Sequence, residues 1–151
     1  MEFIPVNEPL LNGNEKKYLC ECIDTGWISS EGPFVKEFEQ KMSASVNRKY
    51  GIAVSNGTAA LEIACQALDI GEGDEVIMPA FTIISCAMAV TKLGATPVLV
   101  DSDMNDWNML VDDIEAKITD KTKAIMMVHI YGLPVQVDKV LQLAKKYNLK
   151  V

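Results

Sequence analysis

Residues Glu75 to Asp101 read EVIMPAFTIISCAMAVTKLGATPVLVD and give the clearest indication of the fold. The two ends of this stretch, Glu75–Met78 and Pro97–Asp101, are short apolar runs of the length of a strand. Between them, Thr82–Leu93 is rich in small and apolar residues and is followed by Gly94, which predicts a helix with a glycine stop. A strand, a helix and a second strand in this order predict two parallel strands joined by a crossover helix.

The same alternation continues on both sides of this stretch. Strands are predicted at Ile52–Val54, at Lys123–His129 and from Leu149 onward, and helices at Ala59–Leu68, Val111–Ile118 and Val135–Tyr147. Because the strands are apolar on both faces, we expect an α/β fold: a mostly parallel sheet with helices on both faces. The sequence stops at Val151, where a buried strand should begin, so we expect residues 1–151 to be the first part of a larger domain.

Two more helices are predicted before the first strand. Asn12 as N-cap and Glu15 three residues later form a capping-box pattern, and Gly26 suits the end of that helix. Pro33 suits the first turn of the second helix. Its apolar side chains share one face at a spacing of four residues, at Phe34, Phe38 and Met42.

The composition excludes several classes of protein. Of the 151 residues, 49% are hydrophobic and 23% are charged, so a packed core is expected. The formal charge of −7 argues against a surface for nucleic acid or anionic membranes, which depends on clustered cations. No apolar run approaches the roughly 20 residues of a membrane helix. Residues 1–5 also lack the pattern of a secretory signal, so we expect a cytoplasmic protein.

Metal binding is not predicted. The chain has four cysteines without a C-x-x-C pair, and one histidine, His129, without a second histidine to share an ion. We therefore expect buried free thiols.

The strongest local signal for a ligand is the turn that follows Val54, which reads Ser55-Asn56-Gly57-Thr58-Ala59. A helix that opens at such a turn directs unpaired backbone N–H groups and the positive end of its dipole at one spot. Thr58 adds a hydroxyl, and the small Ala59 lets an anion approach the backbone, so the turn can hold a phosphate. The alternative is an ordinary N-capped helix with nothing bound.

Two other phosphate-binding loops are excluded. The chain has no G-x-x-x-x-G-K-[ST] motif of a P-loop. The run Gly71–Val76 lacks the third glycine of a dinucleotide-binding loop and precedes a strand instead of following one.

Five segments, in order, resemble the DegT/DnrJ/EryC1/StrS family of aminotransferases: Asn56–Leu61, Gly73–Ile77, Pro79–Thr82, Gly94–Val98 and His129–Gly132. The resemblance covers nearly the whole chain. It implies the N-terminal part of the large domain of a PLP-dependent enzyme of fold type I. The segments Gly26–Ser30 and Gly32–Val35 look most like the GDP-perosamine synthase branch of that family.

The resemblance also implies roles for particular residues. Gly57, Thr58 and Ala59 match the stretch that grips the phosphate of pyridoxal 5'-phosphate (PLP), and Ile83 matches a usually aromatic residue that packs on the cofactor ring. Trp27, Ser29 and Ser30 resemble a loop near the substrate or the dimer interface; the alternative is a loop anchored by one buried Trp. No catalytic residue is expected within the chain, because the Schiff-base lysine and the aspartate at the pyridine nitrogen lie beyond Val151 in relatives. The chain alone is therefore expected to be inactive.

Such an enzyme would transfer an amino group, from glutamate, to a nucleotide-linked 4-keto-deoxysugar, and the family resemblance implies a homodimer. Two alternatives stay open. One is a sugar 3-dehydratase of the same family, in which histidine replaces the lysine. The other is a short non-catalytic module that keeps the fold.

Overall fold

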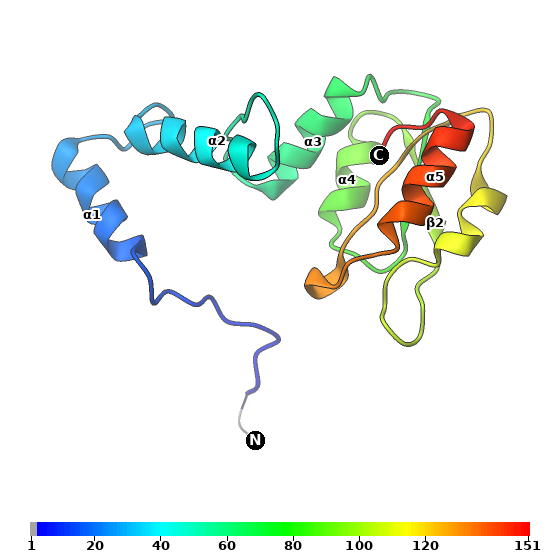
Figure 1. Cartoon of the computed structure of the whole chain (residues 1–151), viewed down its shortest axis with the longest axis horizontal. Helices are drawn as coiled ribbons and strands as arrows, with labels where there is room; N and C mark the ends of the chain where they lie inside the picture. The colour runs from blue at the N-terminus through cyan, green and yellow to red at the C-terminus, as the bar shows by residue number, and fades with distance from the viewer. Residues whose placement is uncertain (1–2) are drawn as a thin grey trace. The chain divides into compact units, whose positions relative to one another are not determined.

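The computed structural model describes residues 3–151, which form two compact units, 3–53 and 54–151. The first unit holds two helices, α1 (Glu15–Thr25) and α2 (Pro33–Ser45), drawn in blue and cyan in Figure 1. The second unit holds three strands and three helices, drawn from green to red.

The two ends of α1 differ in how well the sequence predicted them. The helix ends as predicted, because Gly26 adopts the left-handed conformation (φ 75°) and its amide donates to the carbonyl of Ile23. The predicted capping box at Asn12 is wrong. The N-cap is Asn14, and the Glu15 carboxylate instead accepts a hydrogen bond from the amide of Gly13, at 2.9 Å.

The second helix begins at Pro33, as predicted, because proline lacks the N–H that has no acceptor at a helix start. The Phe34 ring lies 5.1 Å from the ring of Tyr18 in α1. The chain then returns along α2 at Gly51–Ala53, where the amide of Ala53 donates to the Glu39 carboxylate at 2.8 Å.

The sheet of the second unit is parallel and has the order β2-β1-β3. The strands are β1 (Glu75–Pro79), β2 (Thr96–Val100) and β3 (Thr122–Ile125). The helices are α3 (Gly57–Ala67) before β1, α4 (Ser85–Thr91) between β1 and β2, and α5 (Val137–Tyr147) after β3.

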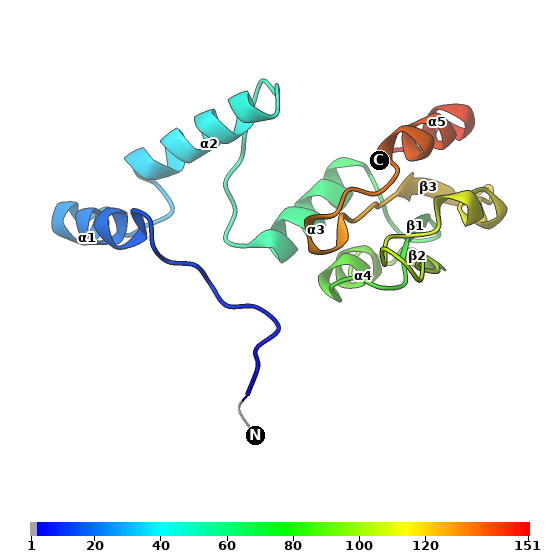
Figure 2. The ribbon, with the colours of Figure 1, turned by 60° about the horizontal axis from the view of Figure 1, so that its bottom comes forward.

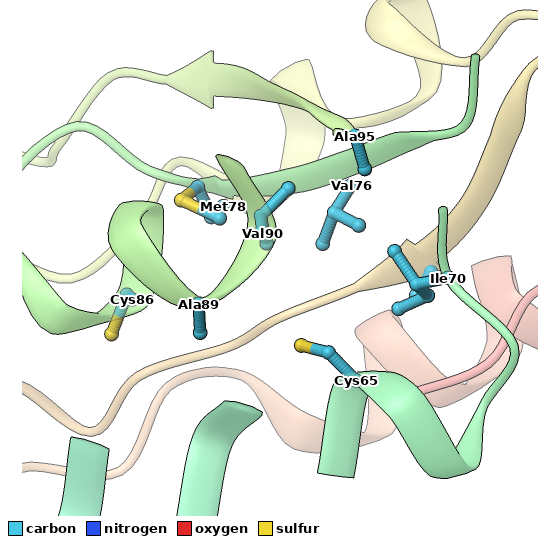
Figure 3. Close-up of a cluster of buried hydrophobic side chains, with 9 residues drawn as sticks. Cys65, Ile70, Val76, Met78, Cys86, Ala89, Val90 and Ala95 are labelled. Carbon is cyan, nitrogen blue, oxygen red and sulfur yellow. The ribbon is translucent and has the colours of Figure 1, made fainter. Parts of the chain in front are cut away.

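Both faces of the central strand β1 are buried, as the sequence predicted, whereas Leu99 of the edge strand β2 is exposed. Val76 and Met78 of β1 point to the face covered by α3 and α4, where Figure 3 shows them beside Val90. Ile77 points to the opposite face, where it packs with residues of α5 and of the segment Met109–Ile114. Figure 2 shows α5 and α4 on opposite sides of the strands. This alternation places apolar side chains on both sides of each strand.

Three predicted elements need correction. Ile52–Val54 is not a strand: its backbone is irregular, the Ala53 amide donates to the Glu39 carboxylate, and the Ile52 side chain is exposed. Instead of a helix over Val111–Ile118, two short 3-10 turns occur, Val111–Asp113 and Glu115–Lys117. The strand predicted to reach His129 ends at Ile125. Beyond it, Lys150 forms a single parallel bridge with Ala124, consistent with the strand predicted from Leu149.

The four cysteines are all free. Cys65 and Cys86 are buried, and burial raises the pKa of the Cys65 thiol. Cys20 is exposed and Cys22 is partly exposed, so the prediction of buried thiols is wrong for the first pair.

Candidate functional site

The start of α3 forms the turn that the sequence singles out. Asn56 is extended (φ −168°, ψ 172°), and its side-chain oxygen accepts a hydrogen bond from the amide of Ala59 at 2.9 Å. The backbone oxygen of Asn56 accepts from the amide of Ala60 at 3.1 Å, the first hydrogen bond of the helix. Asn56 is thus the N-cap, a role that suits its short side chain with an acceptor oxygen.

Capping leaves two amides at this turn without an acceptor. Within residues 3–151, the N–H groups of Gly57 and Thr58 make no hydrogen bond to the protein. A Cβ added at Gly57 would meet no atom within 4 Å, so the space beside the turn is open. Free amides, an open approach and the positive end of a helix of 11 residues are together suited to a bound anion.

A hydroxyl pair extends the site to a second helix. The Thr58 Oγ1 and Ser85 Oγ atoms are 2.9 Å apart, and either can be the donor. Ser85 is the first residue of α4, so the bond joins the starts of α3 and α4. Sequence analysis did not identify Ser85, and no local pattern could have, because 27 positions separate it from Thr58.

Ile83 lies two residues before Ser85, on the segment that connects β1 to α4. This side chain is 65% exposed, so its apolar surface is available to a ligand. Three contacts hold the segment: the amide of Ala80 donates to the Val100 carbonyl at 2.7 Å, the amide of Cys86 donates to the Ile83 carbonyl at 3.1 Å, and Thr82 Oγ1 lies 3.5 Å from Cys86 Sγ. Ile83 therefore lies two residues before Ser85, whose hydroxyl is hydrogen-bonded to Thr58 of the Gly57–Ala59 turn.

Trp27, Ser29 and Ser30 lie in the other unit, on the loop between α1 and α2. The Trp27 side chain is 50% exposed, so the alternative of a loop anchored by a buried Trp is wrong. The Ser29 hydroxyl donates to the carbonyl of Glu31 at 3.2 Å, which tightens the loop. Trp27 and Ser29 line a mostly apolar hollow of about 350 Å³, together with residues of both helices. A role for these three residues in substrate binding stays a prediction.

The described part of the chain holds neither a helix suited to a membrane nor a group of metal-binding side chains. Among residues 3–151, no helix is both long enough and apolar enough to cross a membrane. Over the same residues, no three His, Cys, Asp or Glu side chains are grouped so that they could hold a metal ion.

Residues 9–151 match the DegT/DnrJ/EryC1/StrS aminotransferase family. The chain belongs to this family. A GDP-perosamine synthase of Escherichia coli O157:H7 is 51% identical to it over 151 residues, which are all of this chain and 42% of that protein. A GDP-perosamine synthase of Caulobacter vibrioides is 49% identical over 148 residues, or 98% of this chain and 40% of that protein. The chain thus spans about two fifths of the length of these curated relatives.

Solved structures of aminotransferases share the fold. An aminotransferase from Psychrobacter cryohalolentis superimposes with a TM-score of 0.87 at 39% identity, over 93% of this chain and 36% of that one. NtdA from Bacillus subtilis, solved with bound cofactor PMP, gives a TM-score of 0.83 at 38% identity, over 90% of this chain and 31% of that one. These likenesses confirm the predicted family resemblance and the predicted fold class.

Proposed function

We propose that residues 1–151 are the N-terminal part of the large, PLP-binding domain of a longer sugar aminotransferase. The proposed reaction moves an amino group from glutamate to a nucleotide-linked 4-keto-deoxysugar, as in GDP-perosamine synthesis. The observation that carries this proposal is the identity of 51% to a GDP-perosamine synthase over the whole chain, combined with the free amides at the start of α3. The rest of the large domain and the small C-terminal domain would come from sequence after Val151.

The residues at the turn fit the phosphate of PLP. Its negative oxygens accept hydrogen bonds only, and the turn offers three groups that can donate to them: the amides of Gly57 and Thr58 and the Thr58 hydroxyl. The Ala59 amide serves the turn indirectly, because its bond to Asn56 holds the helix start in place. No lysine is needed here, since the helix dipole supplies partial positive charge.

Ile83 is the proposed contact to the cofactor ring. Its exposed branched side chain can cover one face of a pyridine ring by dispersion. It forgoes the roughly 0.5–1.5 kcal/mol that an aromatic pair can add beyond area burial. PLP, when bound, supplies an electron sink for the amino-acid carbanion. The residues of this chain hold and orient the cofactor, and the lysine and aspartate of the reaction would lie outside residues 1–151. We therefore propose that the 151-residue chain by itself does not transaminate.

The proposed partners are glutamate, a nucleotide-sugar and a second copy of the full-length protein, in the cytoplasm. Trp27, Ser29 and Ser30 are the proposed contacts to substrate or to the second subunit. Apolar side chains that α1 and α2 leave exposed, such as Leu19, Ile23 and Phe38, support a homodimer, because burying them against another surface is favourable. Sedimentation equilibrium of the full-length protein measures this association directly.

The test of the phosphate site is Thr58→Val in the full-length protein. Valine keeps the shape but removes a donor to a charged group, so the affinity for PLP should fall by about 1.5–3 kcal/mol while the fold is kept. The measurement is equilibrium binding of PLP, with far-UV circular dichroism as a check on folding. Thr91→Val is the matched control, because the Thr91 hydroxyl is exposed and bonds only its own helix, at the Met88 carbonyl.

If Thr58→Val binds PLP as tightly as the parent protein, the phosphate site lies elsewhere and the proposal fails. Product analysis separates the two chemistries of the family. Release of water from the sugar without incorporation of nitrogen would favour the dehydratase.

A further inference from the structure

The hydroxyl pair Thr58–Ser85 has a defined direction once an anion is bound at the turn. Thr58 has one hydroxyl proton, and a phosphate oxygen without protons can only accept it. The Thr58 oxygen must then act as the acceptor in the bond to Ser85, 2.9 Å away. Ser85 therefore donates to Thr58, and Thr58 donates to the phosphate.

We propose that Ser85 is a positioning residue for the cofactor phosphate and acts through Thr58. This inference rests on the proposed function, since it needs a phosphate at the Gly57–Ala59 turn. Ser85 positions the phosphate in two ways. Its donated hydrogen bond holds the Thr58 side chain in one rotamer, and the same bond polarises the Thr58 hydroxyl, which makes that hydroxyl a better donor. A preset rotamer lowers the conformational entropy lost on binding.

The bond also joins two parts of the site that are far apart in sequence. Thr58 belongs to the turn at the start of α3, whereas Ser85 follows the segment that carries Ile83. Both hydroxyls are partly buried, so the bond is less exposed to competition from water than one on the open surface. One hydrogen bond thereby fixes the position of the Gly57–Ala59 turn relative to the segment that carries Ile83.

The experiment compares Ser85→Ala with Ser85→Thr in the full-length protein. The probes are PLP and pyridoxal, which lacks the phosphate, and the readout is the dissociation constant of each. Loss of one neutral hydrogen bond predicts that Ser85→Ala weakens PLP binding by about two- to tenfold. Ser85→Thr keeps the hydroxyl that donates to Thr58 and should restore the affinity for PLP to within about twofold of the parent. Pyridoxal binding should be unchanged in both variants, because the effect passes through the phosphate.

Two further variants separate positioning from structure. In the Thr58→Val background, Ser85→Ala should have no additional effect, since the residue through which it acts is gone. Thr91→Ala, which removes a hydroxyl from the same helix without touching Thr58, should leave PLP binding unchanged. If Ser85→Ala does not fold, Ser85→Cys, a much weaker donor of nearly the same size, replaces it in the comparison with Ser85→Thr.

The inference is overturned if Ser85→Ala binds PLP like the parent protein, or if it loses affinity for PLP and pyridoxal equally. Its failure can be distinguished from failure of the proposed function. When Thr58→Val weakens PLP binding and Ser85→Ala does not, only the role of Ser85 is wrong. When neither variant weakens it, both proposals are wrong.

Discussion

The two units of the chain bury their apolar side chains to very different extents. In residues 3–53, α1 has no buried residue and α2 has one, Ser43. In residues 54–151, both faces of the sheet are covered. The largest fully buried side chains all belong to this unit: Ile77, Met78, Ile114, Ile125, Val76, Val90, Val100 and Val140.

Most of the stability of the chain is therefore expected to come from the sheet unit. Burial of apolar surface contributes roughly 25 cal/mol per Å², so the sheet unit can be stabilised by its own core. The helices of the first unit contact each other at Tyr18 and Phe34 but leave other apolar side chains exposed, such as Ile23 and Phe38, and helices of this length gain most of their stability from packing. The candidate phosphate turn, at Gly57–Ala59, therefore lies in the well-packed unit.

Replacing one isoleucine in each unit by alanine tests this comparison and should give the most unequal results. Ile77→Ala in β1 should lower the free energy of unfolding by about 2–5 kcal/mol, because it leaves a cavity where the side chain is fully buried. Ile23→Ala in α1, where the side chain is 70% exposed, should change it by about 0.5 kcal/mol or less. Urea denaturation of the 151-residue chain measures both. Equal losses for the two variants would show that the first unit is packed as tightly as the second.

Much of the fold could be predicted from sequence, because the signals were local or periodic. The two-sided apolar runs at Val76–Met78 and Val98–Val100 predicted parallel strands, of which the first is buried on both faces, and Gly26 predicted the end of α1. Ile52–Val54 has the same apolar character and is not a strand in this structure. A strand needs a neighbour that supplies its hydrogen bonds, and a run of residues does not show whether such a neighbour is present.

The candidate site likewise contains residues that could be predicted from the sequence and residues that could not. The Gly57–Ala59 turn could be found, because a cap residue and small residues at a helix start form a recognisable pattern. Ser85 could not be found, since its role depends on a contact with Thr58 made only in three dimensions. The Glu39 side chain was missed for the same reason: its bond to the amide of Ala53 spans 14 positions.

A smaller effect is expected from two glycines, one in each unit. A Cβ at Gly51 would lie 2.5 Å from the backbone oxygen of Glu39, so Gly51→Ala must displace the returning chain from α2. We expect a cost of about 1–3 kcal/mol, which is typical of overpacking. A Cβ at Gly71 would meet no atom within 4 Å, so Gly71→Ala should be neutral or stabilising by up to about 1 kcal/mol.

Amide hydrogen exchange measures the effect of Gly51→Ala at the residue where it should occur, Ala53. The amide of Ala53, which donates to Glu39, should lose protection in Gly51→Ala and keep it in Gly71→Ala. Unchanged protection of this amide in Gly51→Ala would mean that the contact between Gly51 and α2 is loose, and that the first unit contains no close packing at this point.

The smallest effect concerns a carboxylate that links distant segments of the sheet unit. Asp74 accepts a hydrogen bond from the amide of Gly71 at 2.9 Å and lies 3.3 Å from the Lys123 ammonium group. These interactions, the Gly71 bond first, lower the pKa of Asp74 from its ordinary value of 3.8. Because the folded chain has the lower pKa, the stabilisation is complete above the ordinary value and is lost as the pH falls through the lowered one.

Asp74→Asn should therefore lower the free energy of unfolding by about 1 kcal/mol at pH 7, within the range of a partly exposed ion pair. The difference from the parent chain should shrink as the pH falls below 3.8. It should vanish once the Asp74 carboxyl of the parent is protonated in both the folded and the unfolded chain. Glu37→Gln is the control in the first unit. Its ion pair with Lys41 lies within one turn of α2 and is exposed, so the change should alter the free energy of unfolding by no more than about 0.5 kcal/mol. The midpoints of urea unfolding, measured from pH 2 to pH 7, test this pH dependence. A constant difference for Asp74→Asn over this range would mean that its carboxylate acts through shape and not through charge.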